Sequence, residues 1–157
     1  MTTQDQVCYT FEAAIEMAVK LEEEGFRNYL QAIRTVKHQG AKEILKEAAL
    51  DELEHKHALE KALVEGEVEG HALKSPVPTM NLDYTLQTKT LGADAGAREA
   101  LAFAIHLEKG ALEFYRSMAT GCAGAPMANL FERIANDESR HLQTLEDLYE
   151  EHFLTEN

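Results

Sequence analysis

The sequence predicts an all-α fold, a four-helix bundle made of two antiparallel helix hairpins joined by a long crossover. Long segments repeat apolar residues with the period of an α-helix. Short breaks separate the helices within each half, whereas residues 66–96, rich in Gly and Pro, separate the halves. The chain of 157 residues, 45% of them hydrophobic, suffices for one core, so we expect a single domain over residues 1–157.

The first hairpin is expected at about residues 11–65. Thr10 is a good cap for a helix from about Phe11 to Val36, because its hydroxyl can accept a hydrogen bond from the first turn. His38-Gln39-Gly40 interrupts the apolar period. A second helix then runs from about Ala41 to Glu65 and stops near Gly66, a residue type typical of helix ends.

The second hairpin is expected at about residues 97–153. Its first helix spans about residues 97–120, the turn at residues 121–126 follows, and Pro126 suits the first turn of a helix that runs to about Phe153. The crossover at residues 66–96 is long enough to run from one end of a bundle to the other. We therefore expect the second and third helices to be parallel.

A set of Glu and His residues occurs twice with one spacing. The set is Glu22, Glu52 and His55 in the first half, and Glu108, Glu138 and His141 in the second. Corresponding residues are 86 apart, and in each half a Glu-x-x-His follows a Glu by thirty residues. Residues three apart on a helix lie on nearly the same face. Four carboxylates and two imidazoles can thus converge on one shared, symmetric metal centre.

A third Glu-x-x-His, Glu54 to His57, has no counterpart at the same offset, where Arg140 and Gln143 stand. A chain with 22 Glu and seven His contains roughly one such motif by chance, so we interpret this copy as accidental. The other two copies lie within a wider repeat. Identical residues at the offset of 86 are Ala14/Ala100, Ala18/Ala104, Leu21/Leu107, Tyr29/Tyr115, Ala49/Ala135, Asp51/Asp137, Leu59/Leu145 and Glu60/Glu146.

Composition limits the partners and the compartment. A net charge of −13 argues against nucleic acid or an anionic membrane surface as partner. No apolar run approaches a membrane span, and the first ten residues resemble no export signal, so we expect a cytoplasmic protein. Cys8 and Cys122 form neither a Cys-x-x-Cys pair nor a disulfide framework, and we expect two lone thiols.

The motifs carry a family resemblance over nearly the whole chain. Residues 137–141, Asp-Glu-Ser-Arg-His, are similar to the Asp-Glu-x-Arg-His string of di-iron carboxylate enzymes, and residues 51–55 depart from it only at Glu54. The chain resembles a ferritin-like di-iron protein of the rubrerythrin type. The resemblance implies that Glu52 and Glu138 bridge two iron ions. Terminal coordination would come from Glu22, Glu108, His55 and His141, with either His beside either Glu.

The resemblance departs from rubrerythrins in two places. The rubredoxin-like Cys-x-x-Cys ligands are absent, so electrons are expected from a separate donor protein. Rubrerythrins carry a second acidic ligand one turn from the Glu of the third helix, where this chain has Ile105 and Ala111. The implied function is nevertheless the reduction of hydrogen peroxide to water. The alternatives are an iron-handling ferroxidase or storage protein that reacts with O₂, and a non-catalytic metal-binding bundle.

The chemistry of the ligands is consistent with this implication. Carboxylates and imidazoles without thiolates suit iron, manganese or zinc. Four carboxylates carry −4 and two divalent ions carry +4, so the loaded site is neutral and can be buried. Two ferrous ions supply the two electrons that cleavage of a peroxide requires. We expect two iron ions per site and a homodimer in solution.

Four residues are candidates to support the ligands. Asp51 and Asp137 can each accept the outer N–H of an imidazole from the opposing helix, or can be plain exposed acids. Tyr29 and Tyr115 lie two turns after Glu22 and Glu108, so each phenol can hydrogen-bond a ligand carboxylate or simply pack in the core. The other histidines are expected to be ordinary surface or core residues: His38, His57, His71, His106 and His152.

Overall fold

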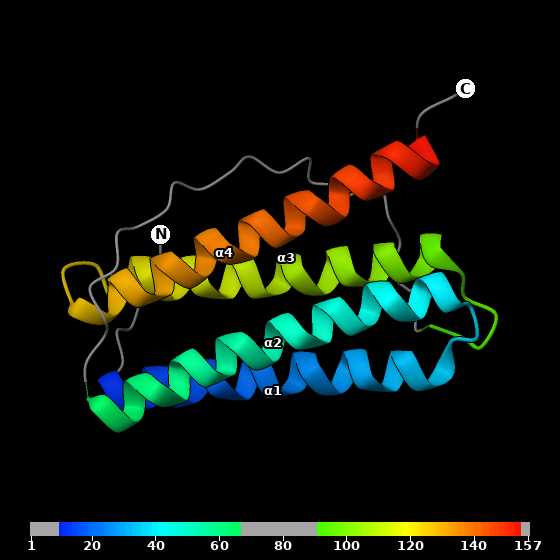
Figure 1. Cartoon of the computed structure of the whole chain (residues 1–157). Helices are drawn as coiled ribbons and strands as arrows, with labels where there is room; N and C mark the ends of the chain where they lie inside the picture. Colours follow the sequence, from blue (N-terminus) through cyan, green and yellow to red (C-terminus); the bar gives the residue numbers. More distant parts are fainter. Residues whose placement is uncertain (1–9, 67–90, 155–157) are drawn as a thin grey trace, which may run out of the picture.

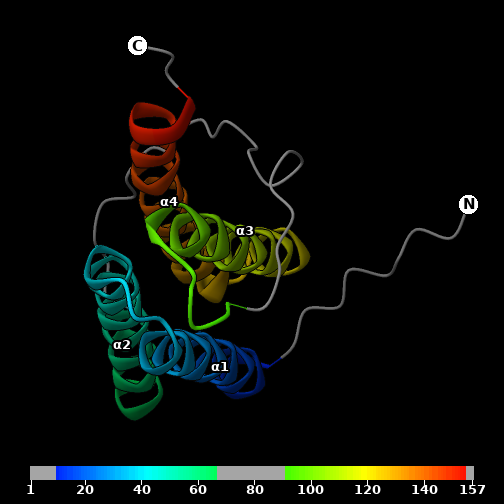
Figure 2. The same cartoon turned by 90° about the vertical axis from the view of Figure 1, so that its right-hand side faces the viewer.

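The computed structural model describes residues 10–66 and 91–154, and it confirms an all-α four-helix bundle. The helices are α1 (Phe11–Thr35), α2 (Gln39–Glu65), α3 (Ala97–Gly121) and α4 (Pro126–Tyr149), followed by a short π-helix, η2 (Glu150–Leu154). Figure 1 shows α2 and α3 running in the same direction, as predicted for hairpins joined by a crossover. Viewed along the bundle, α1 with α2 and α3 with α4 form two separate pairs (Figure 2).

The ends of the helices follow from local chemistry. The hydroxyl of Thr10 accepts a hydrogen bond of 3.3 Å from the Ala13 amide, as expected of a cap. Gly66 ends α2 with a φ of 70°, a left-handed conformation that costs glycine little because it has no Cβ. Pro126 occupies the first turn of α4, also as expected.

Two predicted boundaries need correction. The second helix begins at Gln39 rather than Ala41, because His38 caps it: His38 Nδ1 accepts a hydrogen bond of 3.1 Å from the Ala41 amide. His38 was expected to be an ordinary residue, but a capping imidazole does what Asn or Ser does at this position. At the other end, the α-helical hydrogen bonding of α4 stops at Tyr149, and the last turn to residue 154 is a π-helix.

Apolar residues form two clusters. One joins α1, α2 and α3 near the start of α2 and includes Tyr29, Leu45 and Ala104. The other joins all four helices, follows the α3–α4 pair and includes Tyr115 and Phe131. Among the described residues, no helix combines the length and the apolarity that crossing a membrane requires. The bundle thus packs as two apolar clusters, and the residues of the predicted metal centre lie in the central turns of its helices.

Cys122 follows the end of α3 and is disulfide-bonded, which corrects the expectation of two lone thiols. The end of α3 lies at the same end of the bundle as the start of α1 (Figure 1). Spacing along the sequence cannot reveal such a neighbourhood, because it arises from the packing of two hairpins. Cys8 and most of the predicted crossover lie outside the described residues.

Candidate metal centre

Four glutamates are buried in the centre of the bundle, one from each helix. Glu22, Glu52, Glu108 and Glu138 are 1%, 6%, 1% and 0% exposed. Glutamate is almost never fully buried without a partner of opposite charge. Each of the four occupies the central turn of its helix, so the antiparallel hairpins bring them to the same level. The folded chain therefore builds a concentrated negative site that only protons or cations can neutralise.

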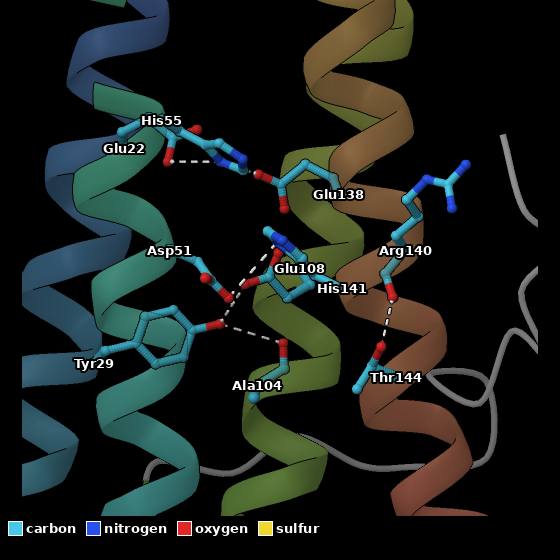
Figure 3. A network of polar contacts seen from close by, with 10 residues as sticks. All are labelled: Glu22, Tyr29, Asp51, His55, Ala104, Glu108, Glu138, Arg140, His141 and Thr144. Atoms are coloured by element: carbon cyan, nitrogen blue, oxygen red, sulfur yellow. Dashed lines mark hydrogen bonds and ion pairs between the residues drawn. The ribbon is translucent and has the colours of Figure 1, made fainter. Parts of the chain in front are cut away.

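The two imidazoles of the repeated motif lie beside one another in this site. The rings of His55 and His141 are stacked, with centroids 5.4 Å apart and an interplanar angle of 16°. His55 Nδ1 lies 2.7 Å from Glu138 Oε1 and 3.7 Å from Glu22 Oε2 (Figure 3). One ligand atom each from His55, Glu138 and His141 fall within 4.8 Å of one another. The geometry therefore gathers candidate ligand atoms from α2 and α4 around one point, and Glu22 of α1 lies beside it.

Several polar atoms of this group are buried without a hydrogen-bond partner. They are Glu22 Oε2, Glu108 Oε2, both Glu138 carboxylate oxygens, His55 Nδ1 and His141 Nδ1. The close contact between His55 and Glu138 lacks the geometry of a hydrogen bond, so the two atoms face each other as two ligands of one ion would. Buried polar atoms are normally paired. These donor atoms fit divalent metal ions bound by oxygen and nitrogen.

Two tyrosines hold the terminal carboxylates, and they do so across the hairpins. The Tyr115 phenol in α3 donates to Glu22 Oε1 in α1 at 2.5 Å. The Tyr29 phenol in α1 donates to Glu108 Oε1 in α3 at 3.2 Å, and also lies 3.4 Å from the Ala104 carbonyl oxygen. In both carboxylates the second oxygen, Oε2, has no hydrogen-bond partner. Each tyrosine thus fixes one oxygen of a carboxylate whose other oxygen has no hydrogen-bond partner.

Both phenols are neutral donors at physiological pH. Burial raises the pKa of Tyr29, and the charges of Glu108 and Glu52 raise it further. Burial likewise raises the pKa of Tyr115, with a further increase from the charge of Glu22. A neutral phenol can only stabilise a carboxylate by donating its proton in a hydrogen bond.

The two aspartates behave differently from one another. Asp51 Oδ2 of α2 lies 3.8 Å from His141 Nδ1 of α4, which puts the two side chains next to each other but is too long for the hydrogen bond that was predicted (Figure 3). Asp137 is half-buried and makes no corresponding contact with His55 within the described part of the chain. His55 is turned toward Glu138 and Glu22 instead. Of the two aspartates at corresponding positions, therefore, only Asp51 lies next to an imidazole of the opposing helix.

Burial and crowding redistribute protons among the acids. Burial, with close contact to Glu22 and repulsion from Glu22 and Glu138, raises the pKa of Glu52 to about 11. Burial and the charge of Glu138 also raise the pKa of Glu108. Burial alone would raise the pKa of Glu138, but its close contacts with Glu108 and His55 lower it. Without metal, protons on some acids thus relieve the repulsion.

The imidazole of His55 is part of the same balance. Burial would lower its pKa, but the contacts with Glu138 and Glu22 outweigh burial and raise it. A protonated His55 beside an ionised Glu138 is therefore the favoured arrangement of the pair. Metal ions would replace both the proton on His55 and those on the glutamates, which makes metal uptake pH-dependent.

Gly25 of α1, which belongs to none of the sequence motifs, makes room for the side chain of Glu52. A methyl group at Gly25 would lie 2.8 Å from Glu52 Oε2 and 2.9 Å from its Cδ. The Glu52 carboxylate therefore rests against the backbone of α1. The corresponding position in the second half is Ala111, which is 8% exposed. A glycine in the middle of a strongly helical segment was the available signal, because it usually has a packing reason.

The third Glu-x-x-His and the histidines outside the repeated set are exposed wherever the structure describes them. Glu54 and His57, the accidental motif, are exposed on α2, as are His106 on α3 and His152 in η2. His71 lies outside the described residues. The repeated motifs therefore differ from the third copy by their burial at the centre of the bundle.

The fold and the site together are those of a carboxylate-rich, ferritin-like helical bundle with a candidate metal site. A family model for rubrerythrin matches residues 99–157, which form the second hairpin and the end of the chain. This match confirms the resemblance to a ferritin-like di-iron protein of the rubrerythrin type. No curated protein and no solved structure matches the chain. The match is consistent with iron binding and with oxidoreductase chemistry, and it covers Glu108, Glu138 and His141 but not the first hairpin.

Proposed function

We propose that the protein is a di-iron oxidoreductase that reduces hydrogen peroxide to water with electrons from a separate donor. The observation that carries the proposal is the matched pair of terminal carboxylates. Glu22 and Glu108 each have one oxygen held by a tyrosine of the opposite hairpin and one buried oxygen without a partner. Such carboxylates are oriented in advance for a metal ion, which is how supporting hydrogen bonds tune a metal site.

Six residues would hold the iron. Glu52 and Glu138 would bridge two ions, and Glu22, Glu108, His55 and His141 would complete the coordination. The four carboxylates balance the charge of two ferrous ions, so the loaded centre tolerates the burial that the glutamates show. When bound, two ferrous ions supply the two electrons that convert one hydrogen peroxide and two protons into two molecules of water.

The protein's own residues would position the ligands and handle charge. Tyr29 and Tyr115 hold the terminal carboxylates, and their raised pKa keeps the phenol protons on oxygen. Asp51 beside His141 orients an imidazole that is only half-buried, on the side of the centre nearest the surface. We propose a separate electron-donor protein as the partner and a homodimer as the state in solution.

Stopped-flow mixing tests this proposal. Anaerobic protein loaded with ferrous iron is mixed with hydrogen peroxide or with O₂, and the absorbance of ferric iron is followed. We expect oxidation by peroxide to be at least tenfold faster, and turnover to require an added reductant. His141→Ala should abolish the reaction, whereas His106→Ala, at an exposed position on the same bundle, should leave it unchanged.

Two other outcomes would contradict the proposal. Faster oxidation by O₂ with growth of a mineral core would assign the protein to iron handling or storage. Binding of metal without oxidation by either reagent would leave a non-catalytic metal-binding bundle.

A further inference from the structure

A cavity of about 100 Å³ lies between α2 and α4 and reaches the metal centre from the surface. Its outer lining includes Glu47 and Thr144, which are exposed, and its inner lining includes Ala48 and Glu108, which are buried. Asp51 and His141 stand between these two ends. Figure 3 shows Asp51 extending from α2 toward His141 and Glu108, with Thr144 one turn beyond His141 on α4.

The cavity ends on a buried group that has no partner. Glu108 is 1% exposed, and its Oε2 makes no hydrogen bond. A volume of about 100 Å³ holds a few water molecules, and although Ile44, Leu145 and Leu148 form part of the wall, the polar groups of Glu47, Asp51, Glu108, His141 and Thr144 can hydrogen-bond them. A small hydrated species can therefore pass from the surface to a ligand of the centre.

The charge of the lining selects among small species. Glu47 and Asp51 are acidic, Thr144 is neutral and polar, and no Lys or Arg is among the described residues that line the cavity. A cleft lined by charge of one sign concentrates counter-ions and speeds their association. A neutral molecule such as hydrogen peroxide would gain nothing from these charges. The acidic mouth therefore favours a divalent cation over a neutral or anionic reactant.

We propose that this cavity is the passage by which divalent cations reach the centre, with Glu47 receiving the ion at the surface and Asp51 passing it inward. The proposal rests on the proposed metal centre, whose glutamates and imidazoles would be the ion's destination. It assigns a function to Glu47, which belongs to no motif and coordinates nothing in the centre. It also gives Asp51 a second role besides orienting His141.

The test is the rate at which metal-free protein takes up Co²⁺, followed by stopped-flow absorbance of the bound ion. At low ionic strength, Glu47→Gln should slow uptake by roughly three- to tenfold, and the difference should disappear in high salt because screening removes electrostatic attraction. The final Co²⁺ content per chain should be unchanged. The matched control is Glu54→Gln, which removes the same charge from an exposed position of the same helix outside the cavity and should leave the rate within about twofold.

A second variant tests the passage itself without changing charge. Thr144 is exposed and its hydroxyl bonds only the Arg140 carbonyl oxygen at 3.0 Å, so Thr144→Leu should fold and narrow the mouth. Uptake should again slow by severalfold, now in high salt as well. Equal rates for Glu47→Gln and Glu54→Gln, or slowing by Thr144→Leu alone, would overturn the assignment to cations. Failure of the unmodified protein to bind any Co²⁺ would instead contradict the metal centre.

Discussion

The two hairpins contribute the same chemical groups to the centre, but neither organises its own. Each supplies a terminal Glu, a Glu-x-x-His and a Tyr at the same spacing. Tyr29 of the first hairpin holds Glu108 of the second, and Tyr115 of the second holds Glu22 of the first. The His55 contact with Glu138 also crosses between hairpins. The centre is therefore a property of the interface between the halves, and an isolated hairpin could not orient its ligands.

Corresponding Glu and His residues of the two hairpins nevertheless have different surroundings. Glu52 leans against Gly25 in the first half, whereas the second half has Ala111 at the matching position. His55 is buried and contacts two glutamates, whereas the side chain of His141 is 30% exposed and lies near Asp51. The centre is thus open toward α4 and closed toward α1. A duplicated motif predicts equal ligands, but packing decides which side of the site meets solvent.

Removal of either bridging glutamate is expected to have the largest effect. If Glu52 and Glu138 each contact both ions, Glu52→Ala and Glu138→Ala should each reduce metal content from about two ions per chain to nearly none. Metal analysis after gel filtration measures this directly. The two hairpins would then be equivalent at the bridging positions despite their different surroundings. Retention of one ion by Glu138→Ala would show that each hairpin holds its own metal.

Proton balance predicts the next effect, on the metal-free protein. The pKa of Glu52 is about 11 in the folded chain, against 4.5 for a free glutamate, so between these values folding binds a proton. The raised pKa values of Glu108 and His55 act in the same direction. The free energy of unfolding should therefore fall as pH rises from 5 to 8, by up to about 1.4 kcal/mol per pH unit for each such proton.

Thermal melts at several pH values check this sign. The metal-free protein should melt at progressively lower temperature from pH 5 to pH 8. Metal replaces the protons, so the gap between loaded and metal-free protein should widen over the same range. The lowered pKa of Glu138 opposes this trend only below about pH 4.5, where its carboxylate takes up a proton in the unfolded chain before it does so in the folded chain. Parallel melting curves for the two forms would contradict a buried carboxylate cluster.

Substitutions at Gly25 and at the corresponding Ala111 should have smaller effects. They should change the stability of the metal-free protein and its affinity for metal separately. A methyl group at Gly25 would meet the flexible end of Glu52, which can move aside, while alanine favours the helix by about 1 kcal/mol. Gly25→Ala should therefore melt no lower than the unmodified metal-free protein. Its displaced Glu52 should bind metal more weakly, by about 1 to 3 kcal/mol or roughly five- to 150-fold.

The reciprocal change is the control. Ala111→Gly creates no contact with a ligand and should cost about 1 kcal/mol of helix stability while leaving metal affinity nearly unchanged. Isothermal titration with Co²⁺ and thermal melts of both variants measure the two quantities separately. Equal loss of affinity in both variants would show that the halves respond alike, and that the contact between Gly25 and Glu52 has no special role.

Much of this architecture could be predicted because it depends on local periodicity. The spacing of three within each Glu-x-x-His puts both side chains on one face of a helix, and the repeat of the whole set at an offset of 86 predicted that the two copies share one site. Caps such as Thr10 and Gly66 are equally local, since their hydrogen bonds or φ angles involve only the adjacent turn. Long-range features that follow from helix periodicity are thus accessible from the chain alone.

The rest depended on how the two hairpins meet. Distances between segments remote in sequence decide three features of the molecule. They decide which tyrosine holds which carboxylate, why Asp51 lies near an imidazole and Asp137 does not, and how Cys122 finds a disulfide partner. The cavity at Glu47 has the same origin, because it is the space that α2 and α4 leave between them. No spacing within a single helix encodes such a gap.

The smallest expected effect is that of a substitution in the third Glu-x-x-His. It tests whether this spacing alone is enough to bind a metal ion. Glu54 and His57 have the same spacing as the two buried motifs, but both are exposed on the outer side of α2. His57→Ala should leave metal content, affinity and melting temperature unchanged to within about 0.5 kcal/mol, the usual range for exposed substitutions. His55→Ala, two residues earlier, should remove a ligand from the centre and weaken metal binding by tenfold or more. Titration of both variants with Co²⁺ compares a buried and an exposed Glu-x-x-His on the same helix. A measurable loss of metal in His57→Ala would mean that burial between the hairpins does not decide which Glu-x-x-His binds.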